Sequence, residues 1–187
     1  MKIETVTWRK HGKTATIDLV TMALFASLGI ATKNIIYPLA ATITGPLYIP
    51  AGSVAGGLFM IWPIIAYGLV RKVGAATTVA LIQASISLLM PFGNFGLLTF
   101  IVYLAPGLAI DGVFLVSNHK ACCAGCCLVA AAIANAVGTL LVGLLILALP
   151  SIALLFTVMI AAISGGIGGL IANVLLHKTR KMGVTIE

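Results

Sequence analysis

Long apolar segments separated by short turns dominate the pattern of this chain. A hydrocarbon layer of roughly 30 Å is crossed by about 20 residues of helix, and six segments qualify or nearly qualify. They are Ile17–Tyr37, Ala51–Val70, Ala75–Met90, Gly96–Val116, Ala121–Leu149 and Ile152–Leu176. The third is the shortest, and we expect its end to bend near Pro91. The pattern predicts an all-α integral membrane protein, a bundle of six transmembrane helices.

Composition supports this fold class. The chain is 61% hydrophobic and 8% charged, with a mean hydropathy of +1.19, whereas soluble domains carry about 25% charged residues. The first apolar segment exceeds the ~7–15 residues of a signal peptide and therefore predicts an uncleaved helix. No long polar linker divides the chain. We expect one domain over residues 1–187, with 1–16 as a cytoplasmic lead-in and 177–187 as a cytoplasmic tail.

The basic residues predict the orientation in the membrane. Ten of the eleven lysines and arginines flank the same ends of the apolar segments: Lys2, Arg9, Lys10, Lys13, Arg71, Lys72, Lys120, Lys178, Arg180 and Lys181. Because cytoplasmic loops carry the excess of basic residues, both termini are expected in the cytoplasm of a prokaryotic cell. Lys33 alone lies near the outer face. This topology accounts for the net charge of +7, so nucleic-acid binding is not expected.

The connection between the first two segments is unusual. The stretch "TKNIIYPLAATITGPLYIP" is apolar, yet it carries Pro38, Gly45, Pro46 and Pro50, which interrupt helices. A broken backbone cannot face lipid with unpaired polar groups. We therefore expect a long apolar outer loop that folds over the protein as a lid or lines a cavity. An ordinary surface loop is the alternative.

Small residues recur at four-residue spacing in three segments. The three ladders are Ala23, Ser27 and Ala31; Ala130, Ala134 and Gly138; and Ala161, Gly165 and Gly169. Such ladders allow close helix packing in lipid. Most are expected to pack the bundle internally, and docking of a separate membrane subunit is the alternative. The run "SGGIGG" lacks the preceding strand of a phosphate-binding loop, so it does not predict a nucleotide site.

Neither a metal centre nor a catalytic site is expected. The run "ACCAGCC" contains Cys122, Cys123, Cys126 and Cys127, but ligands on two neighbouring stripes of one helix do not converge on one tetrahedral point. Packing is the expected role, with palmitoylation or metal contact as alternatives. The histidines lie at the cytoplasmic rim. Asp111 is the only membrane-embedded acid, so the converging groups that catalysis requires are absent.

Polar side chains within the segments or at their outer ends form the candidate binding set. These are Asn34, Tyr37, Tyr48, Gln83, Asn94, Tyr103, Asp111 and Asn135. They suit a small polar or aromatic molecule held between helices. An acid at membrane depth is costly and is normally paired or functional. Asp111 therefore either faces the pocket, pairing with Asn135, Gln83 or the substrate, or forms hydrogen bonds that fix helix packing.

The runs "RKVGAA" and "PGLAIDGVFL", within a similarity over roughly residues 20–120, carry a family resemblance. The chain resembles the membrane S components of energy-coupling factor (ECF) importers, most of all the branch associated with thiamine and hydroxymethylpyrimidine. The resemblance implies a substrate-binding subunit without a cofactor of its own. It would capture a vitamin or related micronutrient from outside, together with a T component and two ATPase subunits.

The same resemblance assigns Ala23, Ser27 and Ala31 as the surface that docks the T component. The expected substrate is thiamine-like or hydroxymethylpyrimidine-like. Haem or another apolar cofactor is the second choice, because the third segment carries Gln83 and Ser87 where acidic side chains would suit a cation. Two alternatives from other classes are a stand-alone membrane carrier or channel, and a structural membrane subunit without its own ligand.

Overall fold

The computed structural model describes residues 16–47, 49–90, 96–117 and 123–181, and nearly all of them are helical. The elements are α1 (Thr16–Thr44), η1 (Gly45–Leu47), α2 (Ala51–Val70), α3 (Ala75–Leu89), α4 (Leu98–Val116), α5 (Ala124–Leu145) and α6 (Ser151–Lys181). Five of these helices are long and apolar enough to cross a membrane, and α3 is a shorter apolar helix. The predicted fold class is confirmed, and the chain is a multi-pass membrane protein.

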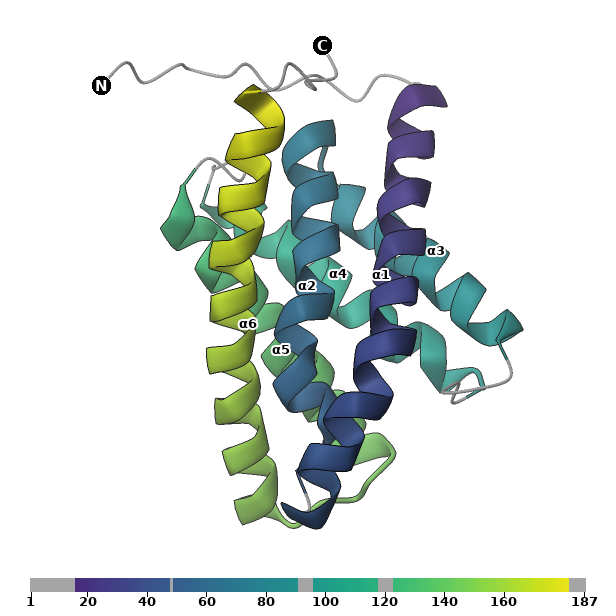
Figure 1. Cartoon of the computed structure of the whole chain (residues 1–187), viewed down its shortest axis with the longest axis vertical. Helices are drawn as coiled ribbons and strands as arrows, with labels where there is room; N and C mark the ends of the chain where they lie inside the picture. The colour runs from purple at the N-terminus through teal and green to yellow at the C-terminus, as the bar shows by residue number, and fades with distance from the viewer. Residues whose placement is uncertain (1–15, 48, 91–95, 118–122, 182–187) are drawn as a thin grey trace.

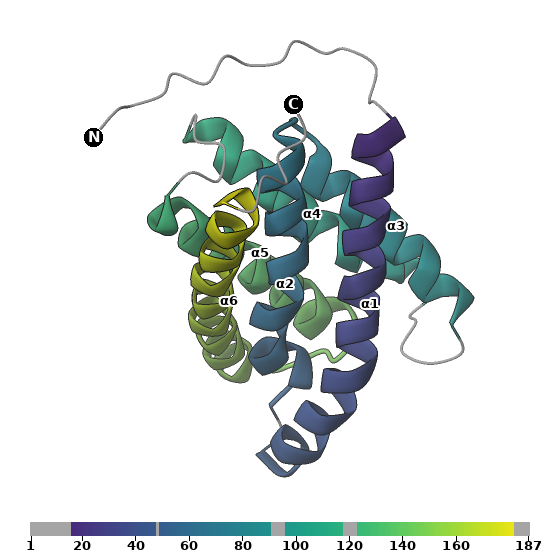
Figure 2. The same ribbon diagram turned by 45° about the horizontal axis from the view of Figure 1, so that its top comes forward.

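Helix α2 forms the centre of the bundle. It lies between α1 and α6 along the long axis of the molecule, while α4 and α5 lie behind this layer in both views (Figures 1 and 2). In its most apolar window 72% of the residues are buried, against 22–33% in the other four long helices. The outer helices therefore expose much of their apolar surface, as helices in contact with lipid do.

Charged residues lie at the start of α1 and in the last turns of α6. Figure 1 shows that α1 begins and α6 ends at the same end of the bundle. Buried Asp18 forms an ion pair with Lys72, just after α2, at 2.5 Å. Arg180 donates a hydrogen bond to the Gly68 carbonyl at 2.7 Å and so satisfies a carbonyl in the last turn of α2. We call this the basic end. Its contacts tie α1 and α6 to the end of α2.

The prediction of a long broken loop after Tyr37 is wrong. Helix α1 continues through Pro38 to Thr44, and only η1 and the residues up to Pro50 separate it from α2. Proline removes one donor from a helix. In an apolar environment, continuing the helix satisfies the remaining backbone groups better than a loop does. The break falls at Gly45 and Pro46, and Pro50 occupies the position before α2.

The run "SGGIGG" packs α6 against two helices at once. A Cβ atom added at Gly168 would overlap the Gly57 backbone of α2, and one added at Gly169 would overlap the Cys127 carbonyl of α5. Gly165 likewise meets the Ala131 carbonyl of α5. Glycines at this spacing let helix backbones touch. Ala130 and Ala134 of the fifth-segment ladder are also fully buried, so the fifth- and sixth-segment ladders are both used for packing within the chain.

Helix ends elsewhere differ modestly from the predicted segments. Helix α3 ends at Leu89, and Met90 is extended (φ −86°, ψ 140°), as expected for a residue that precedes proline. Helix α6 continues past the predicted end at Leu176 to Lys181. Residues 177–181 of the predicted tail are thus a continuation of the helix.

Candidate functional site

Three polar side chains from α1, α3 and α4 meet in the half of the bundle away from the basic end. The Lys33 ammonium donates to the Tyr103 hydroxyl at 2.5 Å, and that hydroxyl lies 3.4 Å from Ser87 Oγ. The ammonium also lies 4.7 Å from the centroid of the Tyr103 ring, within the range of a cation–π contact. Lys33 and Tyr103 are half-buried and Ser87 is buried. We call Lys33, Ser87 and Tyr103 the Lys33 cluster.

The lengths of the helices place this cluster. Helix α3 has 15 residues and α1 has 29, so the end of α3 is level with the middle part of α1. Ser87 lies in the last turn of α3 and Tyr103 in the second turn of α4. The short α3–α4 pair therefore brings two hydroxyl groups to the one basic residue of α1.

Two further predicted residues extend the same side of the site. Gln83, one turn before Ser87, is buried against α1, where a Cβ added at Gly29 would overlap its side-chain amide. Tyr37 lies one turn beyond Lys33 on α1 and is 40% exposed. Because residues four apart share a helix face, Gly29, Lys33 and Tyr37 form one stripe. Gln83, Tyr103 and Tyr37 thus fall in one region of the structure.

Another face of α1 carries the predicted docking ladder. Ala23 is half-buried, while Ser27 and Ala31 are exposed, and the Ser27 hydroxyl donates to the Ala23 carbonyl at 2.9 Å. A groove of about 300 Å³ runs along this face between α1 and α3. Asn34 also lines it and donates to Met90 Sδ at 3.0 Å. Asn34 therefore lies beside the ladder rather than in the Lys33 cluster.

Asp111 lies near the basic end, far along α4 from Tyr103. Its carboxylate accepts hydrogen bonds from the backbone N–H groups of Ala76 at 3.3 Å and Thr77 at 2.9 Å, and from the Thr77 hydroxyl at 2.5 Å. These are the donors that a capping residue normally satisfies. Gly74, at the capping position of α3, has φ +88° and no side chain to do so. Asp111 pairs with neither Asn135 nor Gln83, and its contacts match the packing alternative.

Asn135 lies at the junction of α2, α5 and α6. Its amide donates to the Ala161 carbonyl at 2.8 Å and lies 3.4 Å from the Ser53 carbonyl. A Cβ at Gly56 of α2 would overlap the Asn135 side chain. Both amide donors are directed at carbonyls of neighbouring helices, so the residue links three helices. Of the remaining candidates, Tyr48 and Asn94 lie outside the described residues.

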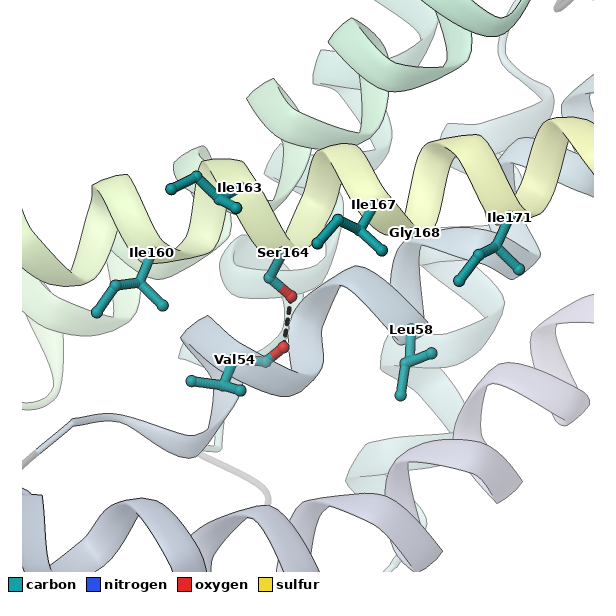
Figure 3. A pocket seen from close by; sticks show the side chains of 8 residues that line it. All are labelled: Val54, Leu58, Ile160, Ile163, Ser164, Ile167, Gly168 and Ile171. Carbon is teal, nitrogen blue, oxygen red and sulfur yellow. Dashed lines mark hydrogen bonds between the residues drawn. The ribbon is translucent and has the colours of Figure 1, made fainter.

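A second groove, between α2 and α6, is larger and almost entirely apolar. It has a volume of about 370 Å³ and is lined mostly by isoleucine, valine and leucine side chains (Figure 3). Its one polar side chain, Ser164, donates to the Val54 carbonyl and accepts from the Gly57 N–H. The groove therefore presents an apolar surface without a directed polar group, whereas binding sites combine both.

The cysteines of the fifth segment take part in helix ends and packing. Cys123 Sγ accepts a hydrogen bond from Cys126 N at the start of α5, and buried Cys127 lies with Sγ 3.9 Å from Asn173 Oδ1 of α6. Cys122 lies outside the described residues. Within the described segments no group of three His, Cys, Asp or Glu side chains could hold a metal ion.

Lys33 is not among the site residues predicted from the sequence. Lysine near the end of an apolar segment usually extends toward the headgroups, so its position alone indicated no ligand contact. Ser87 was noted only for its lack of charge. A signal was nevertheless present, because Lys33 is the one lysine or arginine that the sequence pattern places near the outer face.

Comparisons with known proteins agree with this architecture. One solved chain, described as "Crystal structure of an S-component of ECF transporter", is 24% identical with a TM-score of 0.73, and the match covers 95% of this chain and 88% of that one. At this identity the likeness establishes the fold. No curated protein matches the sequence.

A family model matches more than half of the chain. Its description is "ABC-type cobalt transport system, permease component", and the matched residues are 17–137. Both the family and the fold are those of a transport subunit rather than an enzyme. The expectation that the chain is not an enzyme is therefore confirmed. This chain belongs to the family of ABC-type cobalt transport system permease components, and its fold is that of an ECF transporter S component.

Proposed function

We propose that this chain is the substrate-binding S component of an ECF-type importer. It captures a vitamin or related micronutrient outside the cell, and separate T and ATPase subunits drive uptake. Both termini lie in the cytoplasm in this proposal, because the basic end carries Arg71, Lys72 and the basic residues at the end of α6. The Lys33 cluster then lies in the outer half of the membrane, on the side from which substrate arrives.

One observation carries the proposal. Of the three small-residue ladders, those of α5 and α6 are used within the bundle, whereas Ser27 and Ala31 of α1 remain exposed. A ladder of this kind allows close approach of another helix in lipid. The neighbouring groove between α1 and α3 adds a hollow into which side chains of a partner helix can pack. We assign this face to the T component.

We propose the substrate class from the resemblance of the sequence and from the chemistry of the candidate residues. A thiamine-like or hydroxymethylpyrimidine-like ligand follows from the resemblance of the sequence, and haem or another apolar cofactor is the second choice. Cobalt, which the family description names, has little support from the described residues, because they contain no group of three metal-binding side chains. We therefore keep an organic micronutrient as the substrate class.

Co-purification tests the proposal. The tagged chain is expressed in its native host, extracted in mild detergent and analysed for associated subunits. An S component is expected to retain a T component and two ATPase subunits, and uptake into liposomes should require all of them and ATP. Uptake by the chain alone would instead indicate a stand-alone carrier. Stable assembly without uptake or binding of any micronutrient would indicate a structural subunit.

A further inference from the structure

Lys33 lies away from the other charged residues of the described segments. Of the six basic residues in the described segments, five lie at the basic end, following α2 or in the last turns of α6. The two described acids are also at that end, where Asp18 pairs with Lys72 and Asp111 accepts hydrogen bonds from the start of α3. No acidic side chain of the described segments is therefore placed to neutralise Lys33.

The contacts of Lys33 are made with neutral groups. An ammonium has three N–H donors, and in the described part of the chain Tyr103 receives one of them. The Tyr103 ring adds an attraction through its face, but neither contact carries a negative charge. A cation held partly away from water without a counter-charge is costly. A bound anion would offset this cost.

We propose that the Lys33 cluster binds an acidic group, a carboxylate or phosphate, of the transported molecule. The inference rests on the proposed function, narrows its substrate class to acids, and places the second substrate choice, haem, ahead of thiamine. Lys33 supplies the charge. The Tyr103 hydroxyl, which accepts from Lys33 and donates to Ser87 Oγ at 3.4 Å, holds the ammonium in place. A cationic ligand would instead be repelled by Lys33. Haem, which carries two propionate groups, fits this chemistry, whereas positively charged thiamine does not.

The test compares each acid with a matched neutral derivative, an ester or an alcohol. The purified full-length chain is placed in phosphatidylcholine nanodiscs, and dissociation constants are measured for haem and haem dimethyl ester, biotin and biotin methyl ester, pantothenate and pantothenol, and thiamine. We expect one acid to bind at least about 10-fold more tightly than its neutral partner, because hydrogen bonds between charged groups are stronger than those between neutral groups.

Variants identify the residue that discriminates. Lys33→Met should weaken binding of that acid by about 10- to 100-fold and leave the neutral partner within about 2-fold of the wild-type value. Lys33→Arg should keep most of the affinity, and Tyr103→Phe should lose part of it. Lys178→Met, which removes an exposed charge at the basic end, is the matched control and should bind as the wild type does. Melting temperatures in the same nanodiscs verify that each variant is folded.

Several results would overturn the inference. These are binding of thiamine as the tightest ligand, equal binding of the acids and their neutral partners, no acid bound at all, or a Lys33→Met variant with unchanged affinity for the acid. An anion can also come from lipid, so the measurement is repeated with phosphatidylglycerol in the disc. If phosphatidylglycerol abolishes acid binding through Lys33, the site is a headgroup site and the cargo assignment fails. Each of these outcomes leaves co-purification with the T component and ATPases unaffected, which separates failure of this inference from failure of the proposed function.

Discussion

Asp111 caps a helix to which it does not belong. Its carboxylate accepts a hydrogen bond from the Thr77 N–H at 2.9 Å and another from the Thr77 hydroxyl at 2.5 Å, so α4 satisfies donors at the start of α3. The negative charge also interacts favourably with the positive end of the α3 dipole. Of the two acids in the described segments, the one in α4 thus has a structural partner on the neighbouring helix.

Removing this cap should reduce stability without changing ligand affinity. Asp111→Ala leaves the start of α3 uncapped and is expected to cost about 1–2 kcal/mol, which lowers the melting temperature in detergent by several degrees. Asp111→Asn keeps an acceptor and should cost less. Gly112→Ala, where a Cβ meets open space, is the matched control. A large loss of ligand affinity in a folded Asp111→Asn protein would indicate that Asp111 contacts the ligand.

A large side chain on the exposed ladder of α1 should reduce ATP-driven uptake without changing ligand affinity. Ser27→Trp places a large side chain on the face assigned to the T component, and it separates the helices that would otherwise touch. Ligand affinity of the isolated chain should stay near wild type, because Lys33 lies on another face of α1. ATP-driven uptake should fall at least about 10-fold, since a 1.4 kcal/mol loss of docking already changes an equilibrium by that factor.

The control for this variant is Leu155→Trp, a substitution at a residue of α6 that is 63% exposed. It should leave both binding and uptake unchanged. Equal loss of binding and uptake in Ser27→Trp would mean that the ladder packs the S component itself. Normal uptake would mean that this face of α1 meets only lipid.

The close crossing of α2 and α6 should tolerate no added methyl group at Gly57. A Cβ at this position would overlap the Ser164 carbonyl of α6, so Gly57→Ala should force the helices apart and cost about 1–3 kcal/mol. Gly52→Ala on the same helix meets open space and should be neutral or stabilising by up to about 1 kcal/mol. The melting temperatures of the two variants test this expectation, and equal values would contradict a close contact between α2 and α6 at Gly57.

Replacing Asn135 should affect packing rather than affinity. Asn135→Ala removes the hydrogen bond to the Ala161 carbonyl and leaves a gap between three helices, so a loss of about 1–2 kcal/mol is expected. Ser85→Ala, at an exposed position of α3 whose hydroxyl bonds within its own helix, should change little. Ligand binding measured on the folded variants should be unchanged. A selective loss of affinity in Asn135→Ala would show that the amide contacts the substrate.

The sequence by itself determined the membrane class and most helix positions. Hydrophobic segments of the required length leave few alternatives, because a backbone in lipid must satisfy its own hydrogen bonds. Helix α3 ends before Met90, the residue that precedes Pro91 in the sequence, and α2 begins directly after Pro50. Both boundaries are expected, because helical geometry is disfavoured for the residue before a proline and proline cannot donate. Pro38 does not mark a boundary, because the apolar residues around it favour a continuous helix more than the loss of one donor opposes it. The local sequence pattern therefore predicts which helices form but not where α1 ends.

Only the tertiary structure decided which polar residues meet. Hydropathy gives depth along a helix but not the direction in which a side chain points, and Asp111, Asn135 and Tyr103 were equally plausible on depth. The short α3 sets the register between helices, bringing Tyr103 and Ser87 to Lys33 and placing Asp111 at the start of α3. Likewise, all three small-residue ladders look alike in the sequence. The packing of α6 into α2 and α5 uses two of them and leaves Ser27 and Ala31 exposed, because a helix can bury only the faces that its neighbours cover.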